Sequence, residues 1–98
     1  MLEELYIRDV VSWNVLIAGY AEHGQSECAI LTFIEMEESG VVPDAFSYVS
    51  CLKACGNLYA IAKGQEIHIA IIKKELENDI IGISLIEMYA KCGSVTQA

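Results

Sequence analysis

The chain contains few basic residues and no long apolar run. Only 6 of its 98 residues are lysine or arginine, against 14 acidic residues, which gives a formal net charge of −8. No apolar stretch approaches the ~18 residues that a membrane-spanning helix needs, so we expect no contact with a membrane. The segment from Met1 to Tyr6 is acidic and amphipathic, and it has neither the basic start of a signal peptide nor the arginine-rich bias of a transit peptide.

The sequence also lacks the motifs of catalytic and cofactor-binding sites. It has no P-loop, no glycine-rich nucleotide fingerprint and no serine nucleophile motif. The His-x-Glu and Pro-Cys-x-x-Cys pattern of zinc deaminases is absent as well. We therefore expect a chain that is not an enzyme and binds no cofactor.

The four cysteines are scattered and show no CxxC spacing, which argues against a disulfide framework or a zinc finger. Cys51 and Cys55 share one face of an expected helix, so that they can be imagined as metal ligands together with His68 or Cys92. Packing as a small apolar side chain is nevertheless the commoner role of cysteine. We expect reduced thiols and no metal site.

The sequence does contain an internal repeat. Asp9, Asp44 and Asp79 lie 35 residues apart, and the segment Leu16–Gly24 recurs as Leu85–Gly93. A period near 35 with apolar residues at helical spacing is typical of stacked helix-turn-helix units. The sequence therefore predicts an all-α fold, a solenoid of tandem antiparallel helix-turn-helix repeats.

Counting from the aspartates divides the chain into four segments. We expect residues 1–9 to end a preceding repeat, 10–44 and 45–79 to be full repeats, and 80–98 to be a truncated repeat with its first helix only. The chain is then a piece of a longer array. The expected helices are 12–22, 26–38, 46–57, 60–74 and 83–92, with Asp44 offering a side-chain cap to the third.

Two repeat families share this architecture. The tetratricopeptide signature, a module that binds peptides in its groove, is partly matched by Trp13, Leu16, Tyr20, Ala29 and Phe33. However, Ile17 stands where that signature has glycine, and the period is 35 rather than 34 residues.

The second family matches more closely and over the whole chain. The runs Asp9–Tyr20, Glu35-Met36 and Gly40–Asp44 resemble a pentatricopeptide repeat. The chain also resembles the alternating long and short repeats of the plant PLS subclass. The segments that carry this resemblance are, in order, Leu52–Cys55, Gly64–His68 and Met88–Ser94. In this comparison 45–79 is a long variant.

The resemblance implies binding of single-stranded RNA, with one base read by each repeat. The family's paired readers correspond to Asn14 and Asp44, a pair that in the family favours uracil. An asparagine amide carries both a donor and an acceptor, and an adjacent carboxylate can fix its direction. Val11 and Phe46 occupy the places where the family sandwiches the base, and Lys91 matches a place where related repeats carry a basic residue near the phosphates.

Simpler roles exist for the same residues. Asn14 and Asp44 can cap helices or bond local backbone, and Lys91 can be an ordinary solvated lysine. In the second unit the readers are Val49 and Asp79, and because valine cannot bond a base edge this unit is expected to read weakly. In the third unit, where one residue is missing, the reader is Ile83 or Ser84.

The net charge of −8 weighs against a nucleic-acid partner, because affinity for phosphate depends on lysine and arginine, but the distribution of the charges weakens this objection. On the expected first helices the charges cancel, namely Glu22, Lys53, Glu87 and Lys91. Several further acids lie on the expected second helices, at Glu27, Glu35, Glu37, Glu38 and Glu66. We therefore expect the presumed reading face to carry little net charge.

The leading hypothesis is an RNA-recognition segment of a mitochondrial or plastid RNA-processing factor, one that specifies cytidine-to-uridine editing sites. Its partners are single-stranded RNA and other RNA-editing or processing proteins, and neither DNA nor a membrane. The rival hypothesis is a tetratricopeptide-like scaffold that binds peptides, which fits the acidic surface. A third is a degenerate array that folds poorly, since a solenoid needs about three units for stability.

Overall fold

The computed structural model describes residues 9–96, so most of the segment expected to end a preceding repeat lies outside the described residues. Within this range the chain forms five α-helices and no strand. They are α1 (Val10–Glu22), α2 (Ser26–Glu38), α3 (Ala45–Asn57), α4 (Ile61–Lys73) and α5 (Asp79–Thr96). The expected all-α repeat architecture is confirmed, and the first four helices begin and end within two residues of their expected bounds.

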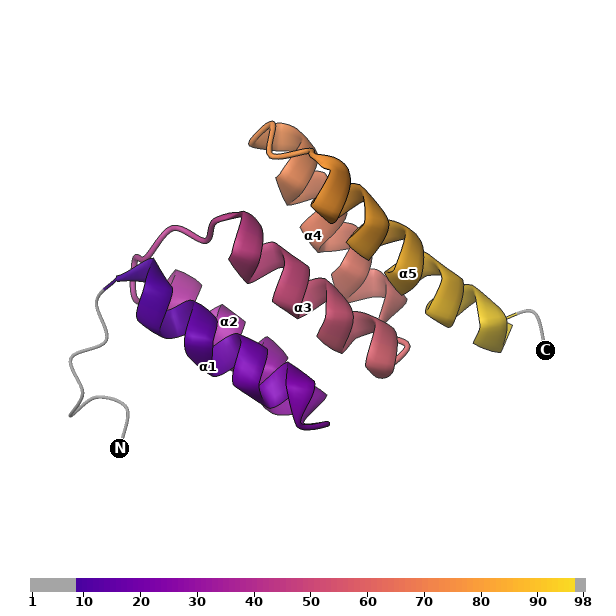
Figure 1. Cartoon of the computed structure of the whole chain (residues 1–98), viewed down its shortest axis with the longest axis horizontal. Coiled ribbons are helices and arrows are strands. Elements are labelled where there is room, and N and C mark those ends of the chain that lie inside the picture. Colours follow the sequence, from indigo (N-terminus) through magenta and orange to yellow (C-terminus); the bar gives the residue numbers. More distant parts are fainter. Residues whose placement is uncertain (1–8, 97–98) are drawn as a thin grey trace.

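The helices form two layers (Figure 1). Helices α1, α3 and α5 lie side by side and roughly parallel in one layer, which we call the first-helix layer, and α2 and α4 lie behind it. The central helix α3 contacts each of the other four. Because the first helices run in the same direction, equivalent residues of successive units lie next to one another across this layer.

Each of the four turns between helices contains one residue in the left-handed backbone region. Gly24 and Gly40 take this conformation after α1 and α2, with φ of 78° and 88°. After α3 and α4 the same place is held by Tyr59 and Glu75, both at φ 56°. In each turn the next residue donates its N–H to a carbonyl five positions earlier, as Gln25 does to Tyr20 at 2.8 Å. This Schellman pattern satisfies the last carbonyls of each helix and reverses the chain.

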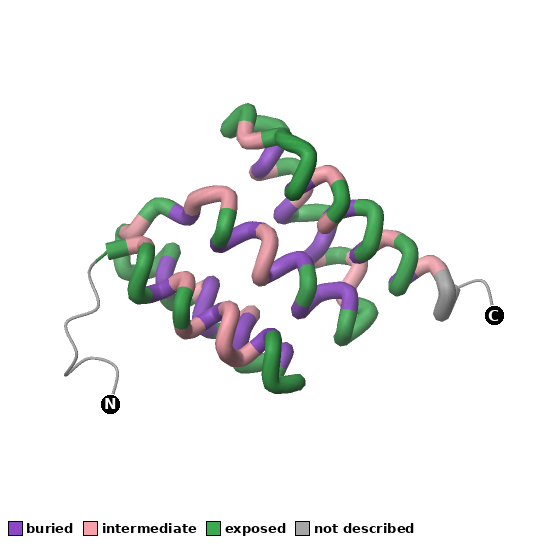
Figure 2. Tube along the Cα trace, viewed as in Figure 1, coloured by how far each residue is buried: buried purple, intermediate pink, exposed green. Residues whose placement is uncertain are grey.

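The core lies between the two layers, and α3 is its most buried helix (Figure 2). The rings of Phe33 from α2 and Tyr48 from α3 pack with centroids 5.6 Å apart, and both side chains are almost completely buried. Each side chain of this size stabilises the fold by roughly 1.5–3 kcal/mol when fully buried. His68 is half-buried and shares a hydrogen bond of 2.9 Å with the Tyr89 hydroxyl.

Helix α5 differs most from the expectation. It begins at Asp79 rather than residue 83 and continues to Thr96 rather than residue 92. The reason for the early start is Asn78, whose Oδ1 accepts a hydrogen bond from the N–H of Ile81 at 2.9 Å and so satisfies the first turn. No helix in the part of the chain that the structure describes is long and apolar enough to cross a membrane.

Candidate nucleic-acid interface

The ends of α1 and α3 bring together two side chains that are 30 residues apart in the sequence. Asp9 caps α1 by accepting from the Ser12 N–H at 3.0 Å, and Asp44 caps α3 in the same way by accepting from the Ser47 N–H at 3.2 Å. Asn14 lies in the second turn of α1, and the parallel packing of α1 against α3 places it beside the α3 cap. Its Nδ2 donates to Asp44 Oδ1 at 3.0 Å.

Ser47 joins this pair to form a closed polar network. Its hydroxyl donates to Asn14 Oδ1 and lies 3.1 Å from Asp44 Oδ1. The same oxygen accepts from the Asp44 backbone N–H at 3.1 Å, which completes a capping box. The Asn14 amide is thus bonded at both its nitrogen and its oxygen, and Asp44 serves α3 and Asn14 at once.

The Asp44 carboxyl is ionised in this setting. Burial alone raises its pKa, but hydrogen bonds from the Asn14 amide, from the Ser47 backbone and hydroxyl and from the Phe46 backbone outweigh that effect. The pKa therefore lies below the ordinary value of 3.8. At neutral pH the group is a carboxylate, which accepts hydrogen bonds and donates none.

Two uncovered apolar side chains accompany the pair. Val11 precedes Asn14 by three residues and so lies on the same side of α1, and 65% of it is exposed. Phe46 lies in the first turn of α3, between Asp44 and Ser47, and is 69% exposed. A flat ring next to a polar group offers a surface on which a nucleobase can stack.

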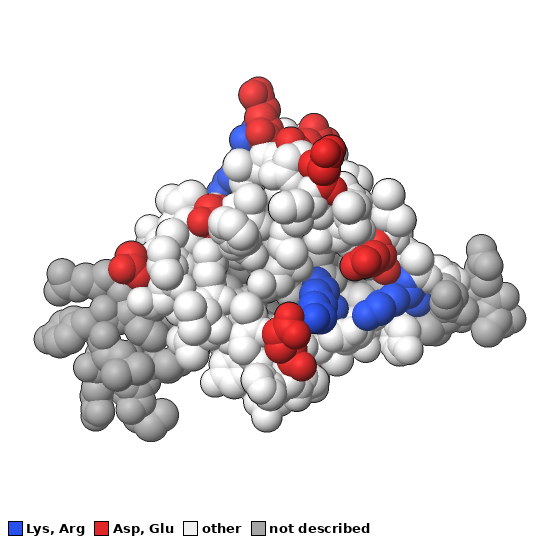
Figure 3. All heavy atoms as spheres, in the orientation of Figure 1, with Lys and Arg blue, Asp and Glu red and all other residues white. Residues whose placement is uncertain are grey.

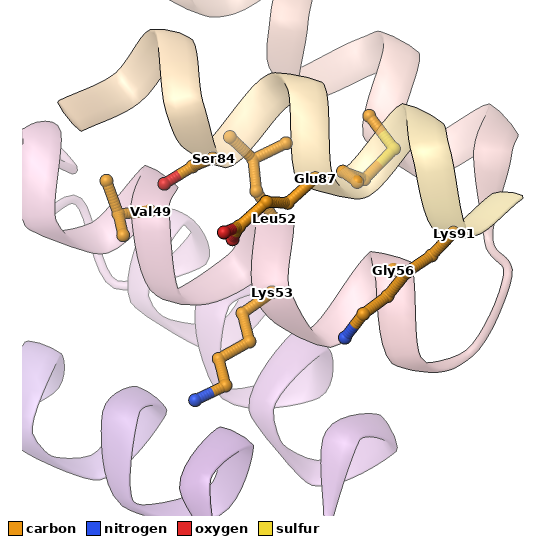
Figure 4. A pocket seen from close by; sticks show the side chains of 8 residues that line it. Val49, Leu52, Lys53, Gly56, Ser84, Glu87 and Lys91 are labelled. Carbon is orange, nitrogen blue, oxygen red and sulfur yellow. The ribbon is translucent and has the colours of Figure 1, made fainter. Parts of the chain in front are cut away.

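The junction between α3 and α5 is built differently (Figure 4). Val49, at the place equivalent to Asn14, lines a cavity of about 160 Å³ together with Leu52, Ser84 and Met88. Valine has no side-chain donor or acceptor, and no network like that of Asn14 forms around it. Weak reading by the second unit stays a prediction.

The caps also show how the third unit is aligned. Asp9 and Asp44 cap α1 and α3, whereas α5 is capped by Asn78 and Asp79 lies exposed in its first turn. Counting five residues from each cap gives Asn14, Val49 and Ile83, so this alignment favours Ile83 over Ser84 as the equivalent place. Ile83 is 58% exposed and, like Val49, has no polar group to offer.

Lys91 lies at the other end of the first-helix layer, far along α5 from the capped ends. Its Nζ donates to Asn57 Oδ1 at 2.8 Å, and Asn57 in turn donates to Ser26 Oγ at 3.2 Å. The structure therefore does not bring Lys91 to Asn14 and Asp44, but it leaves the lysine exposed on the same layer. Glu22 holds the equivalent place on α1 and forms an ion pair with Lys53 at 3.1 Å.

The first-helix layer carries few charges, and its acidic and basic groups lie next to each other (Figure 3). The view down the shortest axis shows a largely uncharged face, with basic side chains flanked by acidic ones in its lower right part. Glu22 of α1 and Lys53 of α3 form an ion pair between these helices. Helices α1, α3 and α5 carry the acids Glu22, Asp79 and Glu87 and the bases Lys53 and Lys91, so these helices hold only a small part of the net charge of −8.

The cysteines contribute to packing. Cys51, Cys55 and Cys92 are buried free thiols, and Cys28 is an exposed one. A hydrogen bond with Cys55 and burial raise the pKa of the Cys51 thiol, which stays protonated. Among residues 9–96 the structure has no group of three histidine, cysteine or acidic side chains placed to hold a metal ion.

Sequence reasoning identified Asn14 and Asp44 but missed Ser47 and Asn78. The Asp-x-x-Ser spacing from Asp44 to Ser47 is a capping signal that was available in the sequence. Its bond to Asn14 was not, because that contact depends on how α1 and α3 pack. The sequence does not distinguish Asn78 from its neighbour Asp79 as the cap of α5, since either residue type can cap a helix.

Comparison with known proteins bears on the whole chain. The model of the PPR (pentatricopeptide) repeat family matches residues 8–57, about half of the chain. A mitochondrial pentatricopeptide repeat-containing protein of Arabidopsis thaliana is 45% identical over 86 residues, which is 87% of this chain and 10% of the relative. A chloroplastic one from the same plant is 44% identical over 100 residues, covering all of this chain and 16% of the relative. The chain thus spans only a small part of the curated relatives that it matches. From the matched family model and the helical repeats we conclude that the chain belongs to the pentatricopeptide repeat family.

Proposed function

We propose that this chain binds single-stranded RNA and that its first unit, residues 10–44, faces one uracil with Asn14 and Asp44. The observation that carries the proposal is the hydrogen bond between Asn14 Nδ2 and Asp44 Oδ1, 3.0 Å long, at the junction of α1 and α3. This contact gives the amide a defined direction. The amide keeps one N–H and one oxygen lone pair for a base edge.

Stacking supplies the other part of the proposed interaction. Val11 and Phe46 are exposed on successive units, and a base held between them contacts an apolar surface on each side. Base stacking on aromatic side chains stabilises single-stranded complexes by on the order of 1–3 kcal/mol per base. Hydrogen bonds from the Asn14 amide then select among bases that stack equally well.

The other two units contribute less in this proposal. Val49 and Ile83 hold the places equivalent to Asn14 and cannot bond a base edge, so these units space the RNA or bind it by stacking alone. The exposed Lys91 amine is proposed to approach a phosphate. The contribution of this contact to RNA affinity falls as salt rises. With only one unit that has a polar reader, this chain alone binds RNA weakly.

We assign the chain to the PLS subclass and to a specificity factor for organellar RNA editing or processing. The alternation of repeat types in the sequence and the relatives named as mitochondrial or chloroplastic support this assignment. In such a factor this segment recognises the RNA, and other parts or partner proteins perform the chemistry. The mitochondrion or plastid is the corresponding location.

Grafting the unit Val10–Asp44 into a longer array of known RNA sequence tests the proposal. We expect the grafted unit to prefer uracil at the facing base, and Asn14→Ala to reduce that preference about thirtyfold, since two hydrogen bonds of about 1 kcal/mol each are removed. Val15→Ala, at an exposed site on the next position of α1, is the control and leaves the preference unchanged. Absence of any uracil preference in the unmutated graft rejects the assignment.

The peptide-binding alternative predicts a different response to salt. An RNA complex loses affinity as salt rises because counterions are released from the phosphates, and ribonuclease destroys it. A partner captured from lysate that resists both treatments favours the scaffold.

A further inference from the structure

We propose that Ser47 is a positioning residue that fixes which way the Asn14 amide points and thereby lets the first unit distinguish uracil from cytosine. The inference rests on the proposed function, because it concerns the base that Asn14 faces. Ser47 is completely buried at the third position of α3 and does not face the RNA itself. It acts through its bond to Asn14.

The direction of the amide follows first from the charge on Asp44. The hydrogen bonds around this carboxyl keep it ionised at neutral pH, so that both of its oxygens only accept. The Asn14 atom that lies 3.0 Å from Asp44 Oδ1 must therefore be the nitrogen, which donates. The Asn14 oxygen is then on the side of Ser47.

The single hydroxyl proton of Ser47 completes the assignment. The Ser47 oxygen accepts from the Asp44 backbone N–H at 3.1 Å, so its own proton is free for another acceptor. Asp44 Oδ1 already accepts from Asn14 Nδ2 and from the Ser47 backbone N–H at 3.2 Å. Asn14 Oδ1 has no other described donor and lies closer, so the proton goes there. The amide is held at its nitrogen and at its oxygen, so it cannot turn over about its Cβ–Cγ bond without losing both hydrogen bonds.

A fixed amide distinguishes two bases that a free amide cannot. Uracil presents a donor at N3 beside a carbonyl acceptor, and cytosine presents an acceptor at N3 beside an amino donor. Both edges pair with an asparagine amide, but the amide must turn over to change from one to the other. When a base is held by stacking, N3 faces one particular atom of Asn14. With that atom fixed as Oδ1, uracil forms both bonds and cytosine places acceptor against acceptor.

The neighbouring unit lacks this device. At α5 the residue three places after the cap Asn78 is Ile81, which is buried and has no hydroxyl. At α1 the residue three places after Asp9 is Ser12, which is exposed and whose N–H bonds to the cap. Among the described junctions, only the one between α1 and α3 joins a capping serine to an asparagine of the preceding unit.

The 98-residue chain, labelled with ¹⁵N, provides the test through its side-chain amide signals and short RNA probes. Oligouridylate and oligocytidylate of equal length are titrated into the parent chain and into Ser47→Ala, Ser47→Thr and Ser12→Ala. Ser47→Ala removes one atom from a buried site, and the backbone amide pattern of α3 reports whether it folds. Ser12→Ala removes the corresponding hydroxyl of the α1 cap and is the matched control.

We expect Ser47→Ala to reduce the ratio of uridylate to cytidylate affinity about three- to tenfold, the effect of one lost hydrogen bond. Ser47→Thr, which keeps the hydroxyl, restores the ratio, and Ser12→Ala does not change it. In the free parent chain the two Asn14 amide protons are separate and as rigid as the backbone, and in Ser47→Ala they become mobile.

The possible failures differ from one another. If the parent chain prefers uridylate and Ser47→Ala, folded, keeps the full ratio, the role of Ser47 is wrong while the proposed function stands. If the Asn14 amide of the free parent chain is mobile, the two-point attachment is wrong whatever the variants do. If the parent binds both probes equally or neither, the proposed function fails, and the inference fails with it.

Discussion

The Asp44 carboxylate makes contacts in two successive units. It caps α3 by accepting from the Ser47 N–H, and it accepts from the Asn14 amide of the preceding unit. A capping role and a reading role were alternatives at the sequence level; the geometry shows the capping contact together with a hydrogen bond to Asn14, and the reading role stays a proposal. A substitution at Asp44 therefore has to be judged by stability and by base preference separately.

The pKa of Asp44 predicts how its contribution to stability depends on pH. Because the pKa in the folded chain lies below the ordinary 3.8, the folded state binds its proton more weakly than the unfolded state does. The resulting stabilisation is complete above the unfolded-state pKa and is lost as pH falls through the folded-state pKa. We expect Asp44→Ala to lower the free energy of unfolding by about 1 kcal/mol at pH 7. Asp44→Asn, which can still cap, lowers it by only a few tenths.

Urea unfolding of the three proteins between pH 7 and about pH 2.5 measures this dependence. The stability difference between the parent and Asp44→Asn stays constant at neutral pH and shrinks below about pH 4, as the carboxyl of the parent takes up its proton. Asp9→Asn at the α1 cap is the control, because Asp9 caps a helix through the Ser12 N–H but has no described hydrogen bond equivalent to that between Asn14 and Asp44. A difference that stays constant down to the lowest pH contradicts the depressed pKa.

At the scale of the helix, the caps decide the alignment of the units more reliably than counting does. Asp79 lies 35 residues after Asp44 but forms the first turn of α5, and the capping contact belongs to Asn78. The two residue types cap about equally well. We infer that the packing of the buried Ile81 and Leu85 of α5 against the core decides whether Asn78 or Asp79 takes the cap position.

This difference leads to a prediction for α5. Asn78→Ala removes the acceptor of the Ile81 N–H and should lower the free energy of unfolding by about 1 kcal/mol. Asp79→Ala removes only a favourable charge near the helix N-terminus, an effect of about 0.3–1 kcal/mol that added salt screens. Urea midpoints of both variants at low and at moderate salt distinguish them. An equal or greater loss for Asp79→Ala at moderate salt means that Asp79 is the cap.

The same contrast explains which parts of the molecule could be predicted. The bounds of the first four helices follow from local signals, namely apolar spacing, the aspartate caps and the glycines at 24 and 40. Tyr59 and Glu75 take the same left-handed conformation, and because neither is a glycine, residue type does not predict it. The contacts of Ser47 with Asn14 and of Lys91 with Asn57 join residues more than 30 positions apart. Such contacts depend on how the helices pack, which residue spacing does not specify.

At the scale of the whole molecule, the question is how a chain with a net charge of −8 can approach RNA. In the first-helix layer, Glu22 forms an ion pair with Lys53. The lysine neutralises this carboxylate, so that Glu22 does not face RNA as an unpaired acid. An ion pair whose side chains are about half exposed contributes at most about 1 kcal/mol to stability. Glu22 therefore affects the electrostatic potential of the face more than the fold.

Reversing the charge of Glu22 should make this face a better ligand for RNA. Glu22→Lys raises the net charge by two units, releases Lys53 from its partner and places a lysine where α5 has Lys91. We expect tighter binding to oligouridylate at low salt and a steeper loss as salt rises, with the slope of log K against log salt increasing by about 0.7 for each further phosphate neutralised. Fluorescence anisotropy over a salt series measures both quantities.

The matched control for that change is Glu35→Lys, which alters the net charge by the same amount at an exposed site of α2, behind the first-helix layer. If affinity depends on where the charge is placed, Glu22→Lys binds more tightly and with the steeper slope, and Glu35→Lys changes little. Equal gains from the two variants mean that RNA responds to the overall charge of the chain. The first-helix layer then has no special role in contacting the phosphates, and the proposed contact of Lys91 with a phosphate has to be abandoned.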